Sequence, residues 1–297
     1  MGKASRSKQR LSTREKIAVQ RVAERRAQVR TRVSLVIGST VAVVAIVAAF
    51  VIIKSMSHSS GAGALPKGTA LSTIVSDVTN VPASTLAAVG KGTIATPPSK
   101  LPGQPALTSA GKPEIVYVGA EYCPYCAAER WSMAVALSRF GTFSNLGVTH
   151  SDTADVLPNT KTLTFYKSSY TSNYVVFSPV EQTDPNKKPL QQITPQQNAL
   201  VAKYDAPPYV SASNQGAIPF VDFGNKYLVS GASYSPQVLQ GKSWAQISAA
   251  LANPSSPIAK AVDGTANVLT ATICKLTSNQ PANVCTAPSI AALSGQL

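Results

Sequence analysis

An apolar, uncharged stretch near the N-terminus does most to restrict how this chain can fold. It runs for 21 residues, from 33 to 53, between Arg32 and Lys54. A helix needs about 20 apolar residues to cross the hydrocarbon core of a bilayer. A cleaved signal peptide is the alternative, with GAGA at 61–64 as the cleavage site, but its apolar region usually spans only about 7 to 15 residues. The sequence therefore predicts one transmembrane helix at 33–53.

Charge on the N-terminal side predicts the orientation of this helix. Residues 1–32 contain eleven Lys or Arg and only two acidic residues. Because basic flanks stay on the cytoplasmic side, we expect a cytoplasmic tail at 1–32 and a single-pass cell-membrane protein with its main domain outside. Most of the net charge of +14 lies in this tail. No aromatic residue interleaves with these cations, which argues against nucleic acid as a partner.

Composition divides the exterior part into segments. Residues 54–69 are small, polar and Gly-rich, which is typical of a flexible tether. Residues 70–111 contain two short helical patterns and a Pro-rich connector, and we expect them to pack on the main domain as an extension. The main domain is predicted at 112–297. Its last part, 254–297, is helical, with Asp263-Gly264 as a break.

Two cysteines, Cys123 and Cys126, stand at the junction of a predicted strand and a predicted helix. EIVYVGA precedes them and is apolar on both faces, as a buried parallel strand is. The helix begins at Pro124. A thiolate at a helix N-terminus is stabilised by free backbone N–H groups and by the helix dipole. Cys123 is therefore the predicted nucleophile, and Cys126 the residue that resolves a mixed disulfide.

Metal binding is the main alternative for this CxxC pair. A structural zinc needs about four ligands, and the sequence has no second CxxC. The remaining cysteines and histidines are Cys274, Cys285, His58 and His150. A Cu(I) site from Cys123, Cys126 and His150 is chemically feasible, because thiolates suit Cu(I). Redox cycling fits the strand-to-helix context better, so we predict neither a bound metal nor a cofactor.

Three motifs together resemble the thioredoxin superfamily. They are AEYCPYC followed by a helix, then AIPF, then KYLVSGASYSPQVL, and they cover about 112–253. The resemblance implies an α/β fold with a central sheet flanked by helices. It also implies that Pro219 is cis, lies against the CxxC and keeps metal from the thiols, with the backbone of Ile218 offered to a substrate. The long gap from Cys123 to Pro219 implies a strand-rich insertion at about 145–205.

Other candidate site residues follow from the same resemblance. Many superfamily members hold a buried acid six residues before the first cysteine, where this chain has Tyr117. Glu121 and Glu129 are the nearby candidates for proton transfer, although we expect both to be exposed. Tyr122, Pro124 and Tyr125 flank the nucleophile and are expected to form the substrate surface.

The exterior part also resembles a second, narrower family. GAEYCPYCAAERW and LSRFGTFSNL are similar to membrane-anchored prokaryotic proteins grouped as a domain of unknown function. This resemblance implies the membrane location and no substrate.

Cys274 and Cys285 form a separate pair near the C-terminus. Disulfides persist in the oxidising compartment that the topology predicts. A bridge between them would close a short loop and stabilise the fold by about 3 kcal/mol. A structural disulfide is therefore expected rather than a relay to the CxxC.

The leading functional hypothesis is a membrane-tethered, extracytoplasmic thiol–disulfide oxidoreductase that acts on cysteine-containing proteins. Its direction, as an oxidase, an isomerase or a reductase, does not follow from the sequence, although the exterior location favours oxidation or isomerisation of secreted proteins. Reductant delivery would need a membrane redox partner, since the predicted span contains no cysteine. The alternative is a non-catalytic thioredoxin-like envelope protein that binds copper or a partner.

Overall fold

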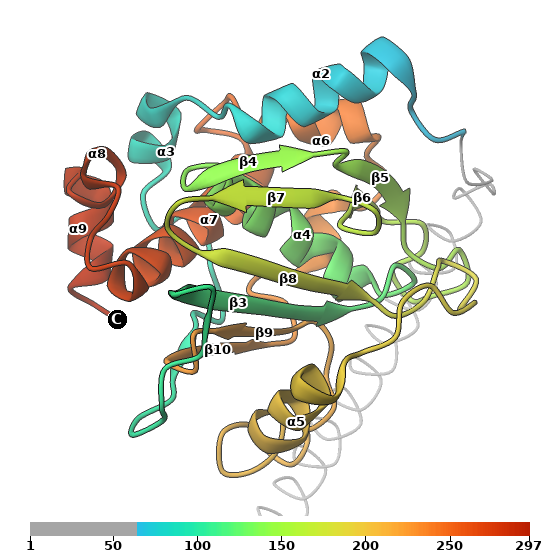
Figure 1. Cartoon of the computed structure of the whole chain (residues 1–297). Coiled ribbons are helices and arrows are strands. Elements are labelled where there is room, and N and C mark those ends of the chain that lie inside the picture. Colours follow the sequence, from blue (N-terminus) through green and yellow to red (C-terminus); the bar gives the residue numbers. More distant parts are fainter. Residues whose placement is uncertain (1–63) are drawn as a thin grey trace, which may run out of the picture. The chain divides into compact units, whose positions relative to one another are not determined.

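A mixed six-stranded sheet forms the centre of the structure, a computed structural model that describes residues 64–297. Helices cover both faces of this sheet (Figure 1). Within residues 64–297, no helix is both long and apolar enough to cross a membrane. The predicted tail at 1–32, span at 33–53 and most of the tether lie outside the described residues.

The central sheet is built around β3, whose last six residues are buried. β3 runs parallel to β8 and antiparallel to β9, and β9 forms a hairpin with β10. The segments EIVYVGA and PFVDF therefore lie in one sheet. The strands are β1 (Ser99–Lys100), β2 (Thr108–Ser109), β3 (Lys112–Gly119), β8 (Val176–Glu181), β9 (Phe220–Phe223) and β10 (Tyr227–Ser230).

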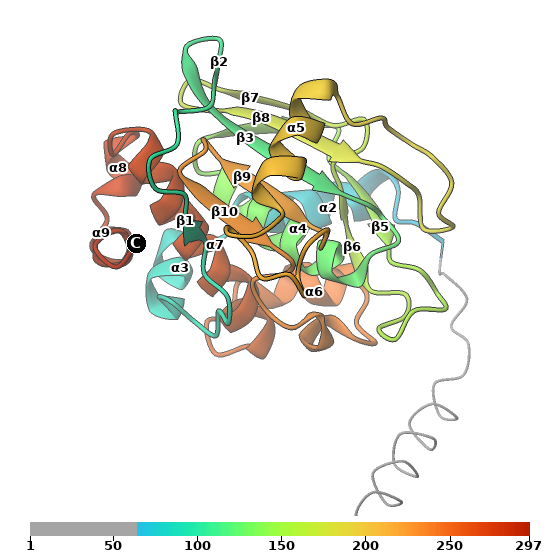
Figure 2. The same cartoon turned by 90° about the horizontal axis from the view of Figure 1, so that it is seen from below.

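Both faces of β3 are apolar because each is covered by helices. Val116 and Val118 pack with Leu200 and Tyr204 of α5 (Pro195–Tyr204) in the smaller of two hydrophobic clusters. On the opposite face Tyr117 joins the larger cluster, to which α4 (Pro124–Leu137) contributes. The view from below shows α5 on one side of β3 and β9, with α4 on the other (Figure 2). Side-chain alternation along one strand thus supplies two separate cores.

The predicted insertion at 145–205 is divided between two places in the structure. β8 lies in the central sheet, and α5 covers one face of that sheet. Both β8 and α5 fall within the range 145–205. The remaining strands form two small antiparallel sheets of their own, β4 with β7 and β5 with β6. Their bounds are β4 (Gly141–Ser144), β5 (Gly147–His150), β6 (Lys161–Thr164) and β7 (Ser169–Ser172).

The N-terminal helices of the described part pack on the C-terminal ones. Asp77 of α2 accepts a hydrogen bond of 2.8 Å from Ser248 of α6. Asn267 of α7 donates to the carbonyls of Leu86 and Gly90, which lie at the end of α3. α2 begins at Gly68, inside the stretch predicted as tether. These elements are α2 (Gly68–Thr79), α3 (Ala83–Val89), a 3-10 turn η1 (Pro236–Leu239), α6 (Trp244–Ala250) and α7 (Pro257–Leu276).

The predicted break at Asp263-Gly264 is wrong, because α7 runs through it without interruption. Gly264 is needed for close packing instead of for a turn. A Cβ at this position would lie 2.6 Å from the carbonyl oxygen of Lys91 and 2.7 Å from the Cα of Gly92. The turn after α3 therefore packs directly on the backbone of α7.

Replacing Gly264 with Ala should destabilise the domain by about 1 to 3 kcal/mol, since backbone atoms cannot move aside as flexible side chains do. In an open helical position the same change would stabilise by about 1 kcal/mol, so the sign is diagnostic. Gly295→Ala is the control, because its Cβ would meet only ordinary contacts, the nearest at 3.6 Å. Denaturant unfolding of both variants measures the difference. A Gly264→Ala protein more stable than the wild type would contradict the packing.

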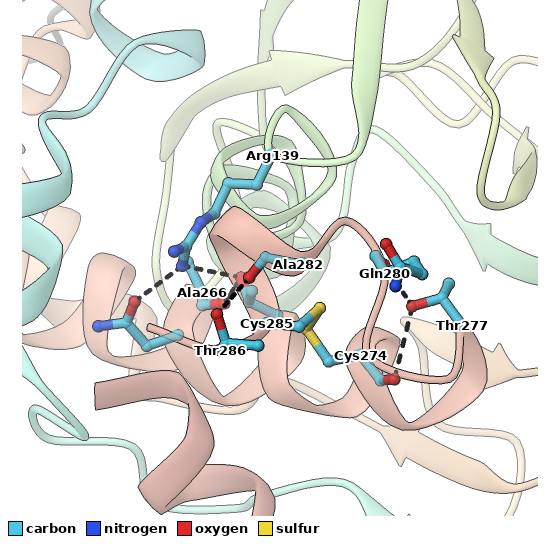
Figure 3. The surroundings of a disulfide bond; sticks show 10 residues. Arg139, Ala266, Cys274, Thr277, Gln280, Ala282, Cys285 and Thr286 are labelled. Atoms are coloured by element: carbon cyan, nitrogen blue, oxygen red, sulfur yellow. Dashed lines mark hydrogen bonds between the residues drawn. A yellow bond between two sulfur atoms is a disulfide. The ribbon is translucent and has the colours of Figure 1, made fainter. Parts of the chain in front are cut away.

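The C-terminal end is closed by the expected disulfide. Cys274 and Cys285 are bonded, with their Cα atoms 5.5 Å apart (Figure 3). The bridge links the last turn of α7 to α8 (Ala282–Cys285), which α9 (Pro288–Ser294) follows. Both sulfurs are buried. This pair is therefore separate from the CxxC and belongs to the core of the fold.

Candidate functional site

The cysteine turn joins β3 to α4. β3 ends at Gly119 and α4 begins at Pro124, so Cys123 occupies the N-cap position of the helix, as predicted. Its sulfur accepts a hydrogen bond of 3.3 Å from the backbone N–H of Cys126. Pro124 fits the first helical position because its missing N–H would be unpaired there in any case.

The two sulfurs have different environments. Cys123 is 5 % exposed and Cys126 is fully buried. A hydrogen bond from the Cys126 side chain is the main cause that lowers the pKa of Cys123, with help from the Cys126 backbone and the charge of Arg130. Burial raises the pKa of Cys126 well above its ordinary value. The pair therefore combines one slightly exposed sulfur that favours the thiolate with one fully buried sulfur that holds its proton.

A loop far along the chain contacts this turn. The Ile218–Pro219 bond is cis, and Pro219 is buried. The Cys123 thiol donates to the carbonyl oxygen of Ile218 at 3.6 Å. Val118 pairs with Phe220 across the sheet, so the strand register itself brings the two segments together. Both predictions for this loop, its cis bond and its contact with Cys123, are confirmed.

Two aromatic side chains and an ion pair line the rim of the turn. Tyr125 is 46 % exposed, and Tyr122 is half-buried. The ammonium of Lys187 lies 5.4 Å from the centre of the Tyr122 ring and 2.9 Å from a carboxylate oxygen of Asp152. The backbone N–H of Asp152 donates to the carbonyl of Tyr122 at 2.8 Å. The β5–β6 loop and the segment after β8 thus lie beside the turn that carries Cys123.

The expectation that Glu121 and Glu129 are exposed is wrong. Both are buried, because α4 and the segment before it are enclosed on all sides. Glu121 accepts from the hydroxyls of Thr149 and Thr164. Glu129 accepts from the backbone N–H and the hydroxyl of Ser233. These hydrogen bonds replace the water that an exposed carboxylate would have.

The sequence reasoning missed a buried ion pair between Arg130 and Glu181. Both side chains are fully buried, and two hydrogen bonds of 2.7 Å join them. Arg130 also donates to the carbonyl of Ala120 at 2.7 Å. One signal was present in the sequence: Arg130 falls between Ala127 and Ala134 at helical spacing, on a face whose neighbouring residues are apolar. A charge on such a face requires a buried partner.

The part of the chain that carries this site belongs to a known family. Residues 102–275 match the family described as Domain of unknown function (DUF929). The chain is a member of the DUF929 family. No curated protein and no solved structure matches it. The DUF929 match includes the two turn cysteines, the cis-proline loop and the buried ion pair.

The copper alternative finds no geometric support in the described part of this DUF929 chain. Nowhere in residues 64–297 do three His, Cys, Asp or Glu side chains group closely enough to hold a metal ion. The ring of His150 instead makes a hydrogen bond of 2.8 Å with the carbonyl of Ser151. His150 and the two turn cysteines therefore do not form a ligand set.

Glu129 should make the stability of the DUF929 domain depend on pH. Burial raises its pKa to about 7, whereas an unfolded chain releases this proton near pH 4.3. The raised pKa therefore contributes stability that is full below about pH 4.3 and is lost as the pH rises through about 7. Glu129→Gln keeps an acceptor for Ser233 and cannot ionise. We expect this variant to gain on the wild type by about 1 kcal/mol per unit between about pH 5 and pH 7.

Denaturant unfolding at the two pH values tests this expectation. Asp155→Asn, a change in the β5–β6 loop, is the control for removing a carboxylate elsewhere. A constant difference between Glu129→Gln and the wild type across the range would show that Glu129 is ionised throughout.

Proposed function

We propose that this DUF929 protein is a membrane-tethered thiol–disulfide oxidoreductase that acts on cysteines of proteins outside the membrane. The observation that carries the proposal is the asymmetry of the pair. Cys123 is the more exposed of the two at 5 %, caps a helix and has a lowered pKa, while Cys126 is fully buried one turn further on. A nucleophile and a resolving group need these two environments.

The reaction is a pair of sulfur exchanges. The Cys123 thiolate attacks a substrate disulfide, so that a bond forms between Cys123 and one substrate sulfur while the other leaves as a thiolate. That thiolate takes up the proton of Cys126. Cys126 then attacks Cys123, closing the 123–126 disulfide and releasing the second substrate thiolate. Two electrons pass to the substrate, and the reverse sequence oxidises a substrate dithiol.

A thioredoxin-like fold is part of this proposal. It is supported by the element order, by the cis bond before Pro219 and by the contact between the Ile218 carbonyl and Cys123. The strand and helix order that supports it is β3, α4, β8, α5, β9 and β10. On this basis the inserted part is the pair of small sheets between α4 and β8, a shorter segment than 145–205.

The location and partners are proposed from the sequence. The uncharged stretch at 33–53 and the basic residues before it support a single-pass anchor with the cysteine pair on the outer side. A membrane redox partner would renew the pair after each turnover, because the proposed span contains no cysteine. No cofactor is required by the sulfur exchanges.

Turnover with a disulfide substrate tests the proposal. The full chain in detergent should catalyse reduction of insulin by dithiothreitol, and it should also oxidise a dithiol peptide when supplied with oxidised glutathione. Cys123→Ser should abolish both activities. Turnover that survives Cys123→Ser would overturn the assignment, and copper binding without turnover by the wild type would favour the non-catalytic alternative.

A further inference from the structure

The Arg130–Glu181 pair lies next to the cysteine turn and is joined to it through one carbonyl. Nη2 of Arg130 donates to the Ala120 carbonyl oxygen at 2.7 Å. The backbone N–H of Cys123 donates to the same oxygen at 3.3 Å. The guanidinium is therefore separated from the Cys123 backbone by a single shared acceptor. Glu181 ends β8 and Arg130 stands in α4, so two elements fix the position of the turn.

Packing alone does not account for charges in this place. Burying an arginine and a glutamate removes both from water, and a well-packed apolar pair of similar volume is often as stable or more stable. The hydrogen bonding of Arg130 and of the neighbouring Tyr117 is also incomplete. Nη1 of Arg130 and the hydroxyl of Tyr117 are buried and have no hydrogen-bond partner among residues 64–297. Buried donors that lack a protein partner call for an explanation.

The charged and titratable groups around the pair are those of the cysteine site. Tyr117 lies near the pair in β3, and Cys126 lies near it in α4. Cys123 and Glu121 belong to the connection between β3 and α4. Arg130 is the cation among them. Its charge favours the ionised form of both cysteines: it helps to lower the pKa of Cys123, and it opposes the rise that burial causes in the pKa of Cys126. Tyr117 stands where the sequence resemblance implies a buried acid, and its hydroxyl stays protonated because burial raises its pKa.

We propose that the Arg130–Glu181 pair positions the cysteine turn and sets the equilibrium between its dithiol and disulfide forms. This inference rests on the proposed thiol–disulfide exchange. Reduction of the 123–126 disulfide by two glutathione molecules yields oxidised glutathione, the Cys126 thiol, the Cys123 thiolate and one proton. Only the product side carries a negative sulfur. Arg130, and not Glu181, is among the main charges that act on both sulfurs, so the pair as a whole stabilises that side and makes the disulfide a stronger oxidant.

The test replaces the ion pair by neutral pairs that can fill the same space. One full-length variant carries Arg130→Met and Glu181→Met, and a second carries Arg130→Gln and Glu181→Gln. Arg130→Lys keeps the positive charge. Arg139→Met is the control, because Arg139 is a half-buried arginine just after α4 that instead bonds to Asn267 and Thr270 of α7.

Two measurements are made on each protein. The first is the equilibrium constant of the 123–126 pair with glutathione at neutral pH. We expect the neutral pairs to favour reduction less than the wild type, by roughly threefold to tenfold. The second is the pH profile of Cys123 alkylation by iodoacetamide, which should move to higher pH. Arg130→Lys should stay close to the wild type, and Arg139→Met should match it in both measurements.

Each outcome decides the matter. Neutral pairs that fold and keep the wild-type equilibrium and alkylation profile would overturn the inference. If neither neutral pair folds, as judged by circular dichroism and an intact Cys274–Cys285 bridge, the role of the pair is structural and the inference also fails. A wild-type protein that forms no 123–126 disulfide in any glutathione buffer would instead overturn the proposed function. The alkylation profile would then still report whether Arg130 acts on Cys123.

Discussion

Replacing Cys126 with Ser should arrest the protein with its substrate attached. Cys123 would still attack, since its position and its contact with Ile218 do not depend on the Cys126 sulfur. Release would fail because no second thiol can attack the mixed disulfide. We expect turnover to fall by about 100-fold or more, as for other residues that form bonds in the reaction. Non-reducing gels and mass spectrometry should show a protein–substrate adduct that reductant removes.

The matched variants give this prediction its control. Cys123→Ser should form no adduct, because the remaining sulfur of Cys126 is fully buried. The variant with both serines reports any adduct formed through Cys274 or Cys285. Equal adduct yields from the two single variants would show that the roles of Cys123 and Cys126 are not distinct.

Glu181→Leu should destabilise the domain by about 3 to 5 kcal/mol. The change leaves the Arg130 guanidinium buried with only the Ala120 carbonyl as a partner. Arginine cannot escape this cost by losing its proton. Denaturant unfolding measures the effect. Changing both members of the pair to Met should cost much less, because no uncompensated charge then remains, and the two effects should be strongly non-additive.

An exposed ion pair provides the comparison for Glu181→Leu. Lys187 and Asp152 are joined at 2.9 Å, but the Lys187 side chain is 61 % exposed. Water and salt replace much of this interaction, so Lys187→Met should change stability far less than Glu181→Leu. Similar losses from the two variants would contradict the burial assigned to the Arg130–Glu181 pair.

Local patterns predicted the parts of the site that depend on neighbouring residues. The apolar run before Cys123 and the Pro after it were sufficient to place the cysteine at a helix start. Gly224-Asn225, a dipeptide typical of tight hairpins, does lie between the antiparallel strands β9 and β10. The short separation of Cys274 and Cys285 made their bridge the simplest pairing. The contact of Pro219 with Cys123 came from a resemblance to a known family and not from local chemistry.

Features that depend on distant segments could not be predicted in this way. Arg130 and Glu181 are 51 residues apart, and only the fold brings β8 beside β3. Glu129 was expected to be exposed because no neighbouring residue indicates its hydrogen-bond donor, Ser233, which lies 104 residues further along the chain. Gly264 was taken for a break because its sequence context does not reveal that the turn around Gly92 packs against it. In each case the deciding partner comes from another part of the chain.

The arrangement of the four cysteines, of which Cys123 at 5 % is the most exposed, has a kinetic consequence for the proposed exchange. Cys126, Cys274 and Cys285 are each at most 3 % exposed, and two of them are already bonded to one another. Electrons can therefore enter and leave only through the Cys123 sulfur, which a substrate and a renewing partner must occupy in turn. Ping-pong kinetics follow, in which each of the two reactants inhibits the other at high concentration. A substrate bound at the rim formed by Tyr122 and Tyr125 would block the redox partner that renews the 123–126 pair. The reaction of the next substrate molecule would then be slower.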